Sequence, residues 1–368
     1  MRRFHTFAIV LVVCFAGCAH RTCEPTGTGL CQLNEDEVGS AIAKRVAIKQ
    51  QRPVSVLVLS GGGAYGAWGA GVLRGWRTNN VDPRPKEFDV VTAISTGSLL
   101  ASHAFLGLDP QDDDELEKAY TTINTPDIYR KRFLLFVPFS ESLYITQPLK
   151  DQLKIRITNE VIDRVGREWE SGRRLYVGTT NLDRGKLIIW DMTCIAHSTD
   201  PLRYDKYRRI LLAATAIPAF FPPVEIEGQL NADGGARAQL FLDKSLLPVV
   251  RRARAAASTR PAAALEAVSG PSVYVLINGK LGLNTVCVDD NIFAIALRSI
   301  ENLLDANMRG DIESVHSLGL QEHFKVHLSY VPDDNSADFA AHDFNAAKMK
   351  KLYDDGVAWG RTEKWIDP

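Results

Sequence analysis

Ser95 is the residue whose type and surroundings point most directly to chemistry. It stands between an expected buried strand at residues 88–94 and an expected apolar helix at 98–106, on a sharp turn flanked by the small residues Ala93 and Gly97. A serine on such a turn projects out of the path of the chain, and its strained backbone requires small neighbours two positions away. A hydroxyl presented in this way can attack a carbonyl carbon. Serine is also a common N-cap residue, so this pattern alone leaves a structural role open.

An activated serine needs a base, and Asp233 is the best-placed candidate. It follows a short expected strand, and Gly234 and Gly235 after it allow another part of the backbone to come close. An aspartate can accept the serine proton directly if its environment raises its pKa and holds it within about 2.6–3.2 Å. None of the histidines lies in a motif-like setting, and His103 is expected to point away from Ser95 along the same helix. Asp-Gly is also a common turn dipeptide, so a purely structural Asp233 is the alternative.

Three consecutive glycines, Gly61, Gly62 and Gly63, form the third feature. They join an apolar strand expected at 54–59 to a helix expected at 64–76. Glycines at a helix N-terminus leave backbone N–H groups open to a negative charge. That charge is either a bound phosphate or an oxyanion that forms only during a reaction.

The phosphate alternative is the weaker one. Gly61, Gly63 and Gly66 fit the G-x-G-x-x-G pattern of dinucleotide-binding proteins. However, the second strand ends at Ile94 and Ser95, where that fold carries an acidic residue. A Walker-type phosphate loop is excluded, because no Gly-Lys-Ser/Thr follows the glycines. An oxyanion hole explains the same glycines and gives Ser95 a partner.

Length and composition indicate a globular protein that does not bind nucleic acid. The chain has 368 residues, of which 45% are hydrophobic, so it can bury a sizeable core. Its net charge of −1 supplies no basic field for a nucleic acid partner.

Expected strands alternate with expected helices along the chain, without internal repeats or a convincing second domain. This alternation predicts an α/β fold with a mostly parallel central sheet that helices cover on both faces. A helix expected at 147–170 precedes two strands at 174–180 and 186–191, which a turn rich in Asn, Asp and Gly joins as a hairpin. A long helix is expected at 291–308.

The first residues are typical of an exported protein. Two arginines precede an apolar run at 7–15 that is too short to cross a bilayer, which indicates a signal peptide. Residues 15–18 resemble a bacterial lipobox, in which Cys18 is lipidated and becomes the first residue of the mature protein. In bacterial lipoproteins of this kind, an acidic residue directly after the lipidated cysteine is a signal for retention in the inner membrane. Ala19 stands at that position here, so by resemblance to these sorting rules we expect a lipoprotein of a Gram-negative outer membrane. The alternative is an ordinary cleaved signal peptide with Cys18 as a plain cysteine.

These signals divide the chain into three parts. Residues 1–17 form the signal peptide, residues 18–52 a tether and N-terminal arm, and residues 53–368 one catalytic domain. Within that domain, residues 53–245 carry the motifs and residues 246–368 complete the fold.

An exported chain meets an oxidising compartment, in which cysteines form disulfides. Cys23 and Cys31 are close enough in sequence to clip the N-terminal arm. Cys194 and Cys287 are able to form a second pair, and the alternative is that both are buried apolar residues. No cysteine spacing resembles a zinc site.

Taken together and in this order, the three motifs resemble those of the patatin-like phospholipase family. Gly61–Gly66 resembles its glycine-rich oxyanion loop, and Ser95 stands in its G-x-S-x-G elbow. Asp233 and Gly234 match its D-G-[GA] motif, and residues 214–224 resemble the segment that precedes that motif in bacterial members.

The resemblance implies a three-layer α/β/α fold and hydrolysis of lipid acyl esters by a Ser–Asp dyad, without histidine, metal or cofactor. Ser95 would attack the ester carbonyl, and Asp233 would take its proton and later activate water. The N–H groups of Gly61, Gly62 and Gly63 would stabilise the oxyanion. The expected substrates are phospholipids, lysophospholipids or related esters in a membrane that the chain reaches through its lipidated cysteine.

Two positions depart from the family pattern, with Tyr65 where many members carry arginine and Ala93 where the elbow carries glycine. They leave open a catalytically silent, lipid-binding member of the same fold. An acyltransferase that passes the acyl group to an alcohol is a further alternative. Residues 130–143, apolar with a basic edge, are expected to form a lid, a membrane-contacting loop or a core segment. Apolar residues that either wall an acyl channel or belong to the core are Ile217, Phe220 and Phe221.

Overall fold

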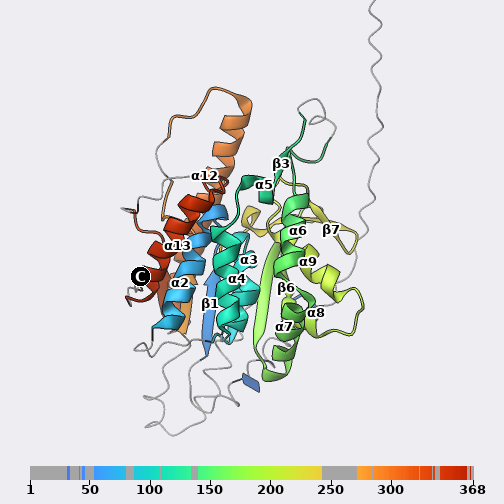
Figure 1. The fold of residues 1–368 in the computed structure, drawn as a ribbon, viewed down its shortest axis with the longest axis vertical. Coiled ribbons are helices and arrows are strands. Elements are labelled where there is room, and N and C mark those ends of the chain that lie inside the picture. The colour runs from blue at the N-terminus through green and yellow to red at the C-terminus, as the bar shows by residue number, and fades with distance from the viewer. Residues whose placement is uncertain are drawn as a thin grey trace, which may run out of the picture.

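The computed structural model describes residues 31–33, 41, 44–45, 54–79, 87–107, 109–133, 140–242, 272–283, 286–322, 324–333, 335, 340–362 and 365 (Figure 1). The expected signal peptide, Cys18 and the expected division at 245/246 lie outside these residues.

A central eight-stranded sheet organises the described chain, in the order β10-β9-β1-β2-β5-β8-β7, with β6 also paired to β5. The five strands from β10 to β5 in that order run parallel, whereas β6 and β8 run antiparallel to β5, and β7 runs antiparallel to β8. The expectation of a mostly parallel sheet is therefore confirmed. The strands are β1 (Ser55–Leu59), β2 (Val90–Ala93), β5 (Arg174–Asn181), β6 (Lys186–Asp191), β7 (Val224–Ile226), β8 (Gln229–Asp233), β9 (Ser272–Leu276) and β10 (Lys325–Ser329).

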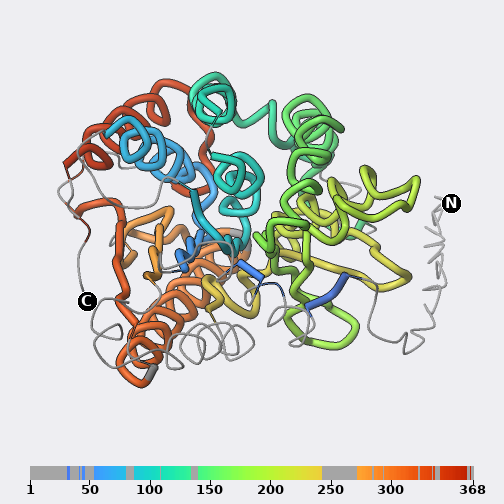
Figure 2. The backbone as a smooth tube through the Cα atoms, turned by 90° about the horizontal axis from the view of Figure 1, so that it is seen from below, coloured from blue at the N-terminus to red at the C-terminus, as the bar shows by residue number. Residues whose placement is uncertain are grey.

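Helices cover both faces of this sheet. Successive side chains of a strand point to opposite faces, and in these strands the side chains on both faces are apolar, so both faces must be shielded from water. Leu57 and Leu59 of β1 join an apolar cluster with one set of helices, whereas Val56 and Val58 join a second cluster on the opposite face. Figure 2 shows the resulting three layers, which confirm the expected α/β/α fold. The first set includes α2 (Gly66–Thr78), α3 (Thr96–Leu106), α4 (Pro110–Thr121) and α13 (Ala346–Gly360), and the second face carries α12 (Ile292–Glu322).

The expected helix at 147–170 is wrong, because the structure has two helices there. Thr158 interrupts the run, and its hydroxyl accepts the N–H of Val161 at 3.3 Å as the N-cap of a new helix. The expected helix at 291–308 is longer than predicted and continues to Glu322. No described helix is long and apolar enough to cross a membrane. The remaining elements are α5 (Thr125–Ile128), α6 (Gln147–Arg156), α7 (Asn159–Ser171), α8 (Met192–His197), α9 (Arg203–Ala214), the short helices η1 (Gly63–Tyr65) and η3 (Gly234–Ala236), and a two-stranded ribbon of β3 (Arg130–Lys131) and β4 (Tyr144–Ile145).

β5 brings two distant segments of the chain to one point. β2 pairs with its first half and places Ala93 opposite Val177. β8 pairs with its second half and places Asp233 opposite Thr179. Because β6 pairs along both halves, it occupies the other edge of β5, so β2 and β8 lie end to end on one edge. Their carboxyl ends face each other, which brings Ser95, just after β2, towards the last residue of β8.

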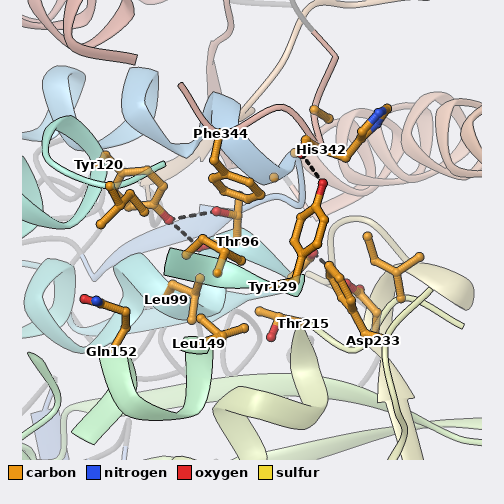
Figure 3. Close-up of a pocket in the computed structure, with 18 of the residues that line it drawn as sticks. Thr96, Leu99, Tyr120, Tyr129, Leu149, Gln152, Thr215, Asp233, His342 and Phe344 are labelled. Carbon is orange, nitrogen blue, oxygen red and sulfur yellow. Dashed lines mark hydrogen bonds between the residues drawn. The ribbon is translucent and has the colours of Figure 1, made fainter. Parts of the chain in front are cut away.

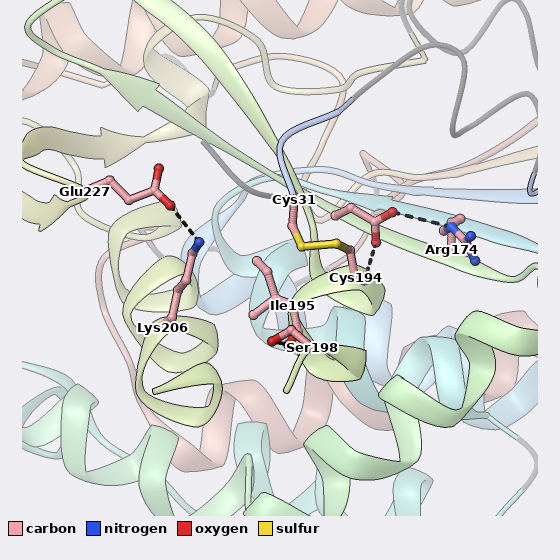
Figure 4. Close-up of a disulfide and its surroundings, with 8 residues drawn as sticks. Cys31, Arg174, Cys194, Ile195, Ser198, Lys206 and Glu227 are labelled. Atoms are coloured by element: carbon pink, nitrogen blue, oxygen red, sulfur yellow. Dashed lines mark hydrogen bonds and ion pairs between the residues drawn. A yellow bond between two sulfur atoms is a disulfide. The ribbon is translucent and has the colours of Figure 1, made fainter. Parts of the chain in front are cut away.

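A disulfide attaches the N-terminal arm to the sheet. Cys31 is bonded to Cys194 at the start of α8, so the expected clip between Cys23 and Cys31 is wrong, and so is a pair between Cys194 and Cys287 (Figure 4). The main chain of Cys31 also accepts the N–H of Asp191 at 2.9 Å, which continues the sheet beyond β6. Cys287 is an exposed free thiol. The sequence distance between Cys31 and Cys194 hid this pairing, since only the sheet brings them together.

Replacing Cys194 with serine is expected to lower the free energy of unfolding by about 2–5 kcal/mol, because the bond closes a long loop in the unfolded chain. Its two cysteines are 163 residues apart in sequence. Thermal unfolding under oxidising conditions measures the effect. The matched control is Cys287→Ser, which removes an exposed free thiol and is expected to leave the melting temperature unchanged. Equal melting temperatures for the two variants would contradict the prediction.

Candidate active site

Ser95 occupies the turn from β2 into α3 with φ 50° and ψ −127°. A non-glycine residue in this region of positive φ is strained by about 1–3 kcal/mol, and such strain gathers at functional sites. Its side chain makes no N-cap hydrogen bond to α3, so the capping alternative does not explain it. A Cβ atom at Gly97 would lie 2.7 Å from the carbonyl oxygens of Leu59 and Ser60, which makes glycine necessary there. Ala93 is fully buried in regular strand pairing, so the turn accommodates alanine at that position.

Asp233 is the hydrogen-bond partner of Ser95. The Ser95 hydroxyl donates to Oδ2 of Asp233 at 2.6 Å, and Oδ1 accepts the N–H of Gly235 at 2.7 Å. The Asp233 side chain is therefore held on both oxygens, at the end of a strand and not merely in a turn. Burial raises the pKa of this carboxyl to about 6, against the opposing effect of the hydrogen bonds from Ser95 and Gly235. A carboxylate with a raised pKa next to a hydroxyl is suited to proton transfer near neutral pH.

The glycine loop lies directly against this pair. A Cβ atom on Gly61 would stand 3.2 Å from Cβ of Ser95, and the φ values of Gly62 and Gly63 are 149° and 57°. Side chains at these two positions would also collide with the carbonyl oxygens of Asn278 and Ala341, at 1.6 and 2.1 Å. Within the described part of the chain, the N–H groups of Gly62 and Gly63 have no acceptor. Two free donors beside a serine hydroxyl are the arrangement that an oxyanion hole requires.

Comparison with known families agrees with this arrangement. A family model described as patatin-like phospholipase matches residues 57–244, a span that contains the glycine loop, Ser95 and Asp233. The chain belongs to the patatin-like phospholipase family. Membership supports a lipid hydrolase and replaces the dinucleotide-binding alternative for the glycine loop.

Similarity to individual proteins adds little to the family match. Among solved structures, VipD from Legionella pneumophila is similar to this chain with a TM-score of 0.41 and 14% sequence identity, over 85% of this chain and 68% of VipD. A search of curated proteins found no match.

A mostly apolar pocket of this patatin-like domain opens beside Ser95 and Asp233 (Figure 3). It runs along α3, whose Thr96, Leu99 and His103 are spaced to line one helical face. Tyr120 and Tyr129 also line it, and their hydroxyls bond within the wall, to Thr96 at 2.7 Å and to the carbonyl oxygen of His342 at 2.8 Å. The three residues expected to wall an acyl channel all line this pocket: Ile217, Phe220 and Phe221.

Several residues at the patatin-like site were not predicted from the sequence. The side-chain amide of Gln239, which is 5% exposed, lies between Gly61 and Gly235, because Cβ atoms on these glycines would come within 2.3 and 2.7 Å of it. Asn278 follows β9 and bonds Ser60, through its N–H to Oγ at 2.8 Å and through Nδ2 to the carbonyl oxygen at 2.7 Å. Gln239 lies shortly after the Asp-Gly-Gly motif, and Asn278 directly follows the apolar run at 273–277. Those two positions are the only sequence signals for them.

His103 lines the same pocket as Ser95, but its ring is hydrogen-bonded elsewhere. Nδ1 of His103 is hydrogen-bonded to Asp112 at 2.8 Å, and both side chains are buried. In the described ranges, no group of three or more His, Cys, Asp or Glu side chains is placed to hold a metal ion. Tyr65 is 9% exposed and belongs to the apolar core, so an aromatic ring fills the position where many members carry arginine.

Proposed function

We propose that this protein hydrolyses acyl esters of lipids through a Ser95–Asp233 dyad and an acyl-enzyme. The observation that carries the proposal is the 2.6 Å hydrogen bond from a strained serine to a buried carboxylate, beside free N–H groups and an apolar pocket. An ester with a long apolar chain fits this combination, since the chain would fill the pocket while its carbonyl reaches the serine.

In the acylation step, Oγ of Ser95 forms a bond to the ester carbonyl carbon and its proton passes to Oδ2 of Asp233. The carbonyl oxygen becomes an oxyanion, which the N–H groups of Gly62 and Gly63 stabilise, with one such donor worth about 2.7–4 kcal/mol. When the intermediate collapses, the bond to the alcohol oxygen breaks, and Asp233 returns its proton to that oxygen. The alcohol portion of the lipid leaves.

In the deacylation step, Asp233 takes a proton from a water molecule, which attacks the acyl carbon of Ser95. The second oxyanion collapses, the bond to Oγ breaks, and the proton on Asp233 passes to Oγ. A free fatty acid leaves and the dyad is restored. If an alcohol replaces water in this step, the same acyl-enzyme gives an acyltransferase.

A lipid panel tests the proposal. Purified protein is incubated with phospholipids, lysophospholipids and neutral glycerides, with and without an added alcohol, and the products are identified by mass spectrometry. Free fatty acid is the expected product, and a serine-reactive fluorophosphonate is expected to label Ser95. New esters of the added alcohol would favour a transferase. Folded protein that gives neither product nor labelling would favour a silent lipid-binding protein.

Activity is expected to rise with pH through about 6 and to level off above it. Asp233 must be ionised to accept the serine proton, and its pKa is raised to about 6 by burial. The measurement is kcat/KM for a neutral, water-soluble ester between pH 4.5 and about 8, so that the substrate itself does not titrate. A profile that is flat across pH 6, or one that falls with rising pH, is incompatible with this role for Asp233.

We also propose that the protein is exported and anchored in the outer membrane through lipidated Cys18. Support comes from the lipobox-like sequence and from the disulfide between Cys31 and Cys194, which is typical of oxidising compartments. Mass spectrometry of the mature N-terminus tests the anchor. A diacylated or triacylated Cys18 is expected, and an unmodified Cys18 would contradict the proposed anchor.

A further inference from the structure

Exposed apolar side chains gather on two segments of the described chain. Of the thirteen large hydrophobic residues that are exposed there, seven lie in the segment 281–303, and two more are Ile145 of β4 and Phe133, two residues after β3. The most exposed of these side chains are Ile292 at 77%, Phe133 at 68% and Leu303 at 66%. Isolated exposed hydrophobics are ordinary, but a concentration of this kind marks an interaction surface.

The first half of α12 has two apolar faces with different surroundings. Leu297, Ile300 and Leu304 line the pocket beside Ser95. At 100° per residue, Ile292 and Leu303 fall on the adjoining face, which is exposed. The second half of the same helix packs on the sheet, so the first half projects from the body of the molecule (Figure 1). The face that lines the pocket and the exposed apolar face therefore adjoin each other on the same half of the helix.

The β3–β4 ribbon lies at the same pocket as this half of α12. Tyr129, next to β3, donates to the carbonyl oxygen of His342 at 2.8 Å, and the His342 ring lies 3.9 Å from Glu301 of α12. Arg130 and Lys131 are exposed on the ribbon, and the exposed Phe133 lies two residues after Lys131. Two cations beside an exposed aromatic ring suit a surface that is apolar within and anionic at its boundary. For the segment 130–143 the sequence leaves a lid, a membrane-contacting loop and a core segment open, and residues 134–139 of it lie outside the described ranges.

We propose that these side chains form a lipid-docking rim that seats the pocket on an anionic bilayer. The rim consists of Ile292, Ile295 and Leu303 on α12, Phe133 after β3, and the cations Arg130 and Lys131. In this position the apolar face of α12 enters the boundary between headgroups and acyl chains, and a lipid chain passes from the bilayer into the pocket along an apolar path. The choice of a lipid surface as the occupant rests on the proposed function, because the exposed face adjoins the pocket that would take the acyl chain.

Vesicle partitioning tests the rim separately from catalysis. The full chain carries Ser95→Ala, so that lipid is not hydrolysed, and Cys18→Ser, so that no anchor binds. Sedimentation with phosphatidylcholine vesicles, with and without phosphatidylglycerol, gives the partition coefficient. The rim variant is Ile292→Ser/Leu303→Ser. The matched control is Leu202→Ser/Leu320→Ser, which removes two side chains of similar exposure, at 68% and 66%, away from the rim.

The parent and the control are expected to bind anionic vesicles equally, and the rim variant at least about tenfold more weakly. Arg130→Glu/Lys131→Glu is expected to weaken binding to anionic vesicles by about tenfold or more and to leave binding to neutral vesicles nearly unchanged. Equal loss in the rim variant and the control would overturn the proposal, and so would a parent that does not bind. Self-association of the parent that the rim variant abolishes, without vesicle binding, would assign this surface to protein contacts instead.

A parallel assay separates the rim from the proposed function. With Ser95 intact, the rim variant is expected to turn over a water-soluble ester at the parental rate and vesicle lipid more slowly. If the rim variant loses vesicle binding and the parent with Ser95 intact hydrolyses neither ester, the rim is retained and the hydrolase is rejected. Active protein with unchanged vesicle turnover in the rim variant would reject the rim and retain the hydrolase.

Discussion

Ester turnover is expected to fall by about 10⁴- to 10⁶-fold when Ser95 is replaced by alanine, because the variant has no nucleophile to form the acyl-enzyme. The substitution removes one oxygen from a turn that the rest of the structure holds in place. The fold is therefore expected to survive, and circular dichroism and thermal unfolding check this. Activity is measured with a soluble ester and with vesicle lipid, so that loss of catalysis is not confused with loss of lipid binding.

Ser98→Ala is the matched control for this variant. Ser98 lies in α3, which begins directly after Ser95, is fully buried, and its hydroxyl has no hydrogen-bond partner among the described residues. The same chemical change, one helical turn from Ser95, is expected to leave kcat near the parental value. Substantial turnover by Ser95→Ala would reject the serine mechanism, and comparable losses in both variants would indicate damage to α3 instead.

Replacing Asp233 with asparagine is expected to lower kcat by about 10²- to 10⁴-fold. The amide fits the same space and keeps an oxygen for the N–H of Gly235, but it cannot take the proton of Ser95. Fluorophosphonate labelling of Ser95 is expected to slow in parallel. If activity persists in this variant and disappears in His103→Gln or His342→Gln, the two pocket histidines, the base is a histidine and the dyad is wrong.

The same substitution is expected to stabilise the protein at alkaline pH. Burial raises the pKa of Asp233 from 3.8 to about 6, so the folded state favours its protonated form. The stability that protonation contributes is fully present below about pH 4 and is lost as the pH rises through about 6, a loss on the order of 2–3 kcal/mol. Asparagine has no proton to lose. The melting temperature of the Asp233→Asn variant is therefore expected to exceed that of the parent by a few degrees at pH 8 and to match it near pH 4. A lower melting temperature than the parent at pH 8 would contradict this account.

If Asp233→Asn both stabilises and inactivates the protein, then Asp233 lowers the stability of the fold in return for activity. A carboxylate that is ionised in a dry site destabilises the fold, but that site is what keeps it basic enough to act near neutral pH. Loss of activity without this gain in stability would point to a positioning role, in which Asp233 only orients Ser95.

The local sequence determined much of this protein. The turn that holds Ser95 at positive φ places Gly97 against the end of β1, and the chain path through Gly62 and Gly63 leaves no room for side chains. The atoms that impose these demands lie on distant segments, but each demand is met by a glycine at a fixed place beside a strand or helix, so it leaves a motif that can be read directly. Alternation of apolar strands and helices likewise predicted the layered sheet, because each strand buried on both faces must be apolar throughout.

Only the tertiary structure decided which distant segments meet. The ends of β2 and β8 come together because both pair with one edge of β5, and no local pattern specifies that register. The bond from Cys31 to Cys194 depends on the arm continuing the sheet beyond β6, so nearness in sequence predicted the wrong partner. The contribution of Gln239 to the site depends in the same way on Asp311 of α12, which accepts its N–H at 2.6 Å. A hydrogen bond or a disulfide forms where the folded path brings its atoms within reach, and that path is set by packing over the whole domain.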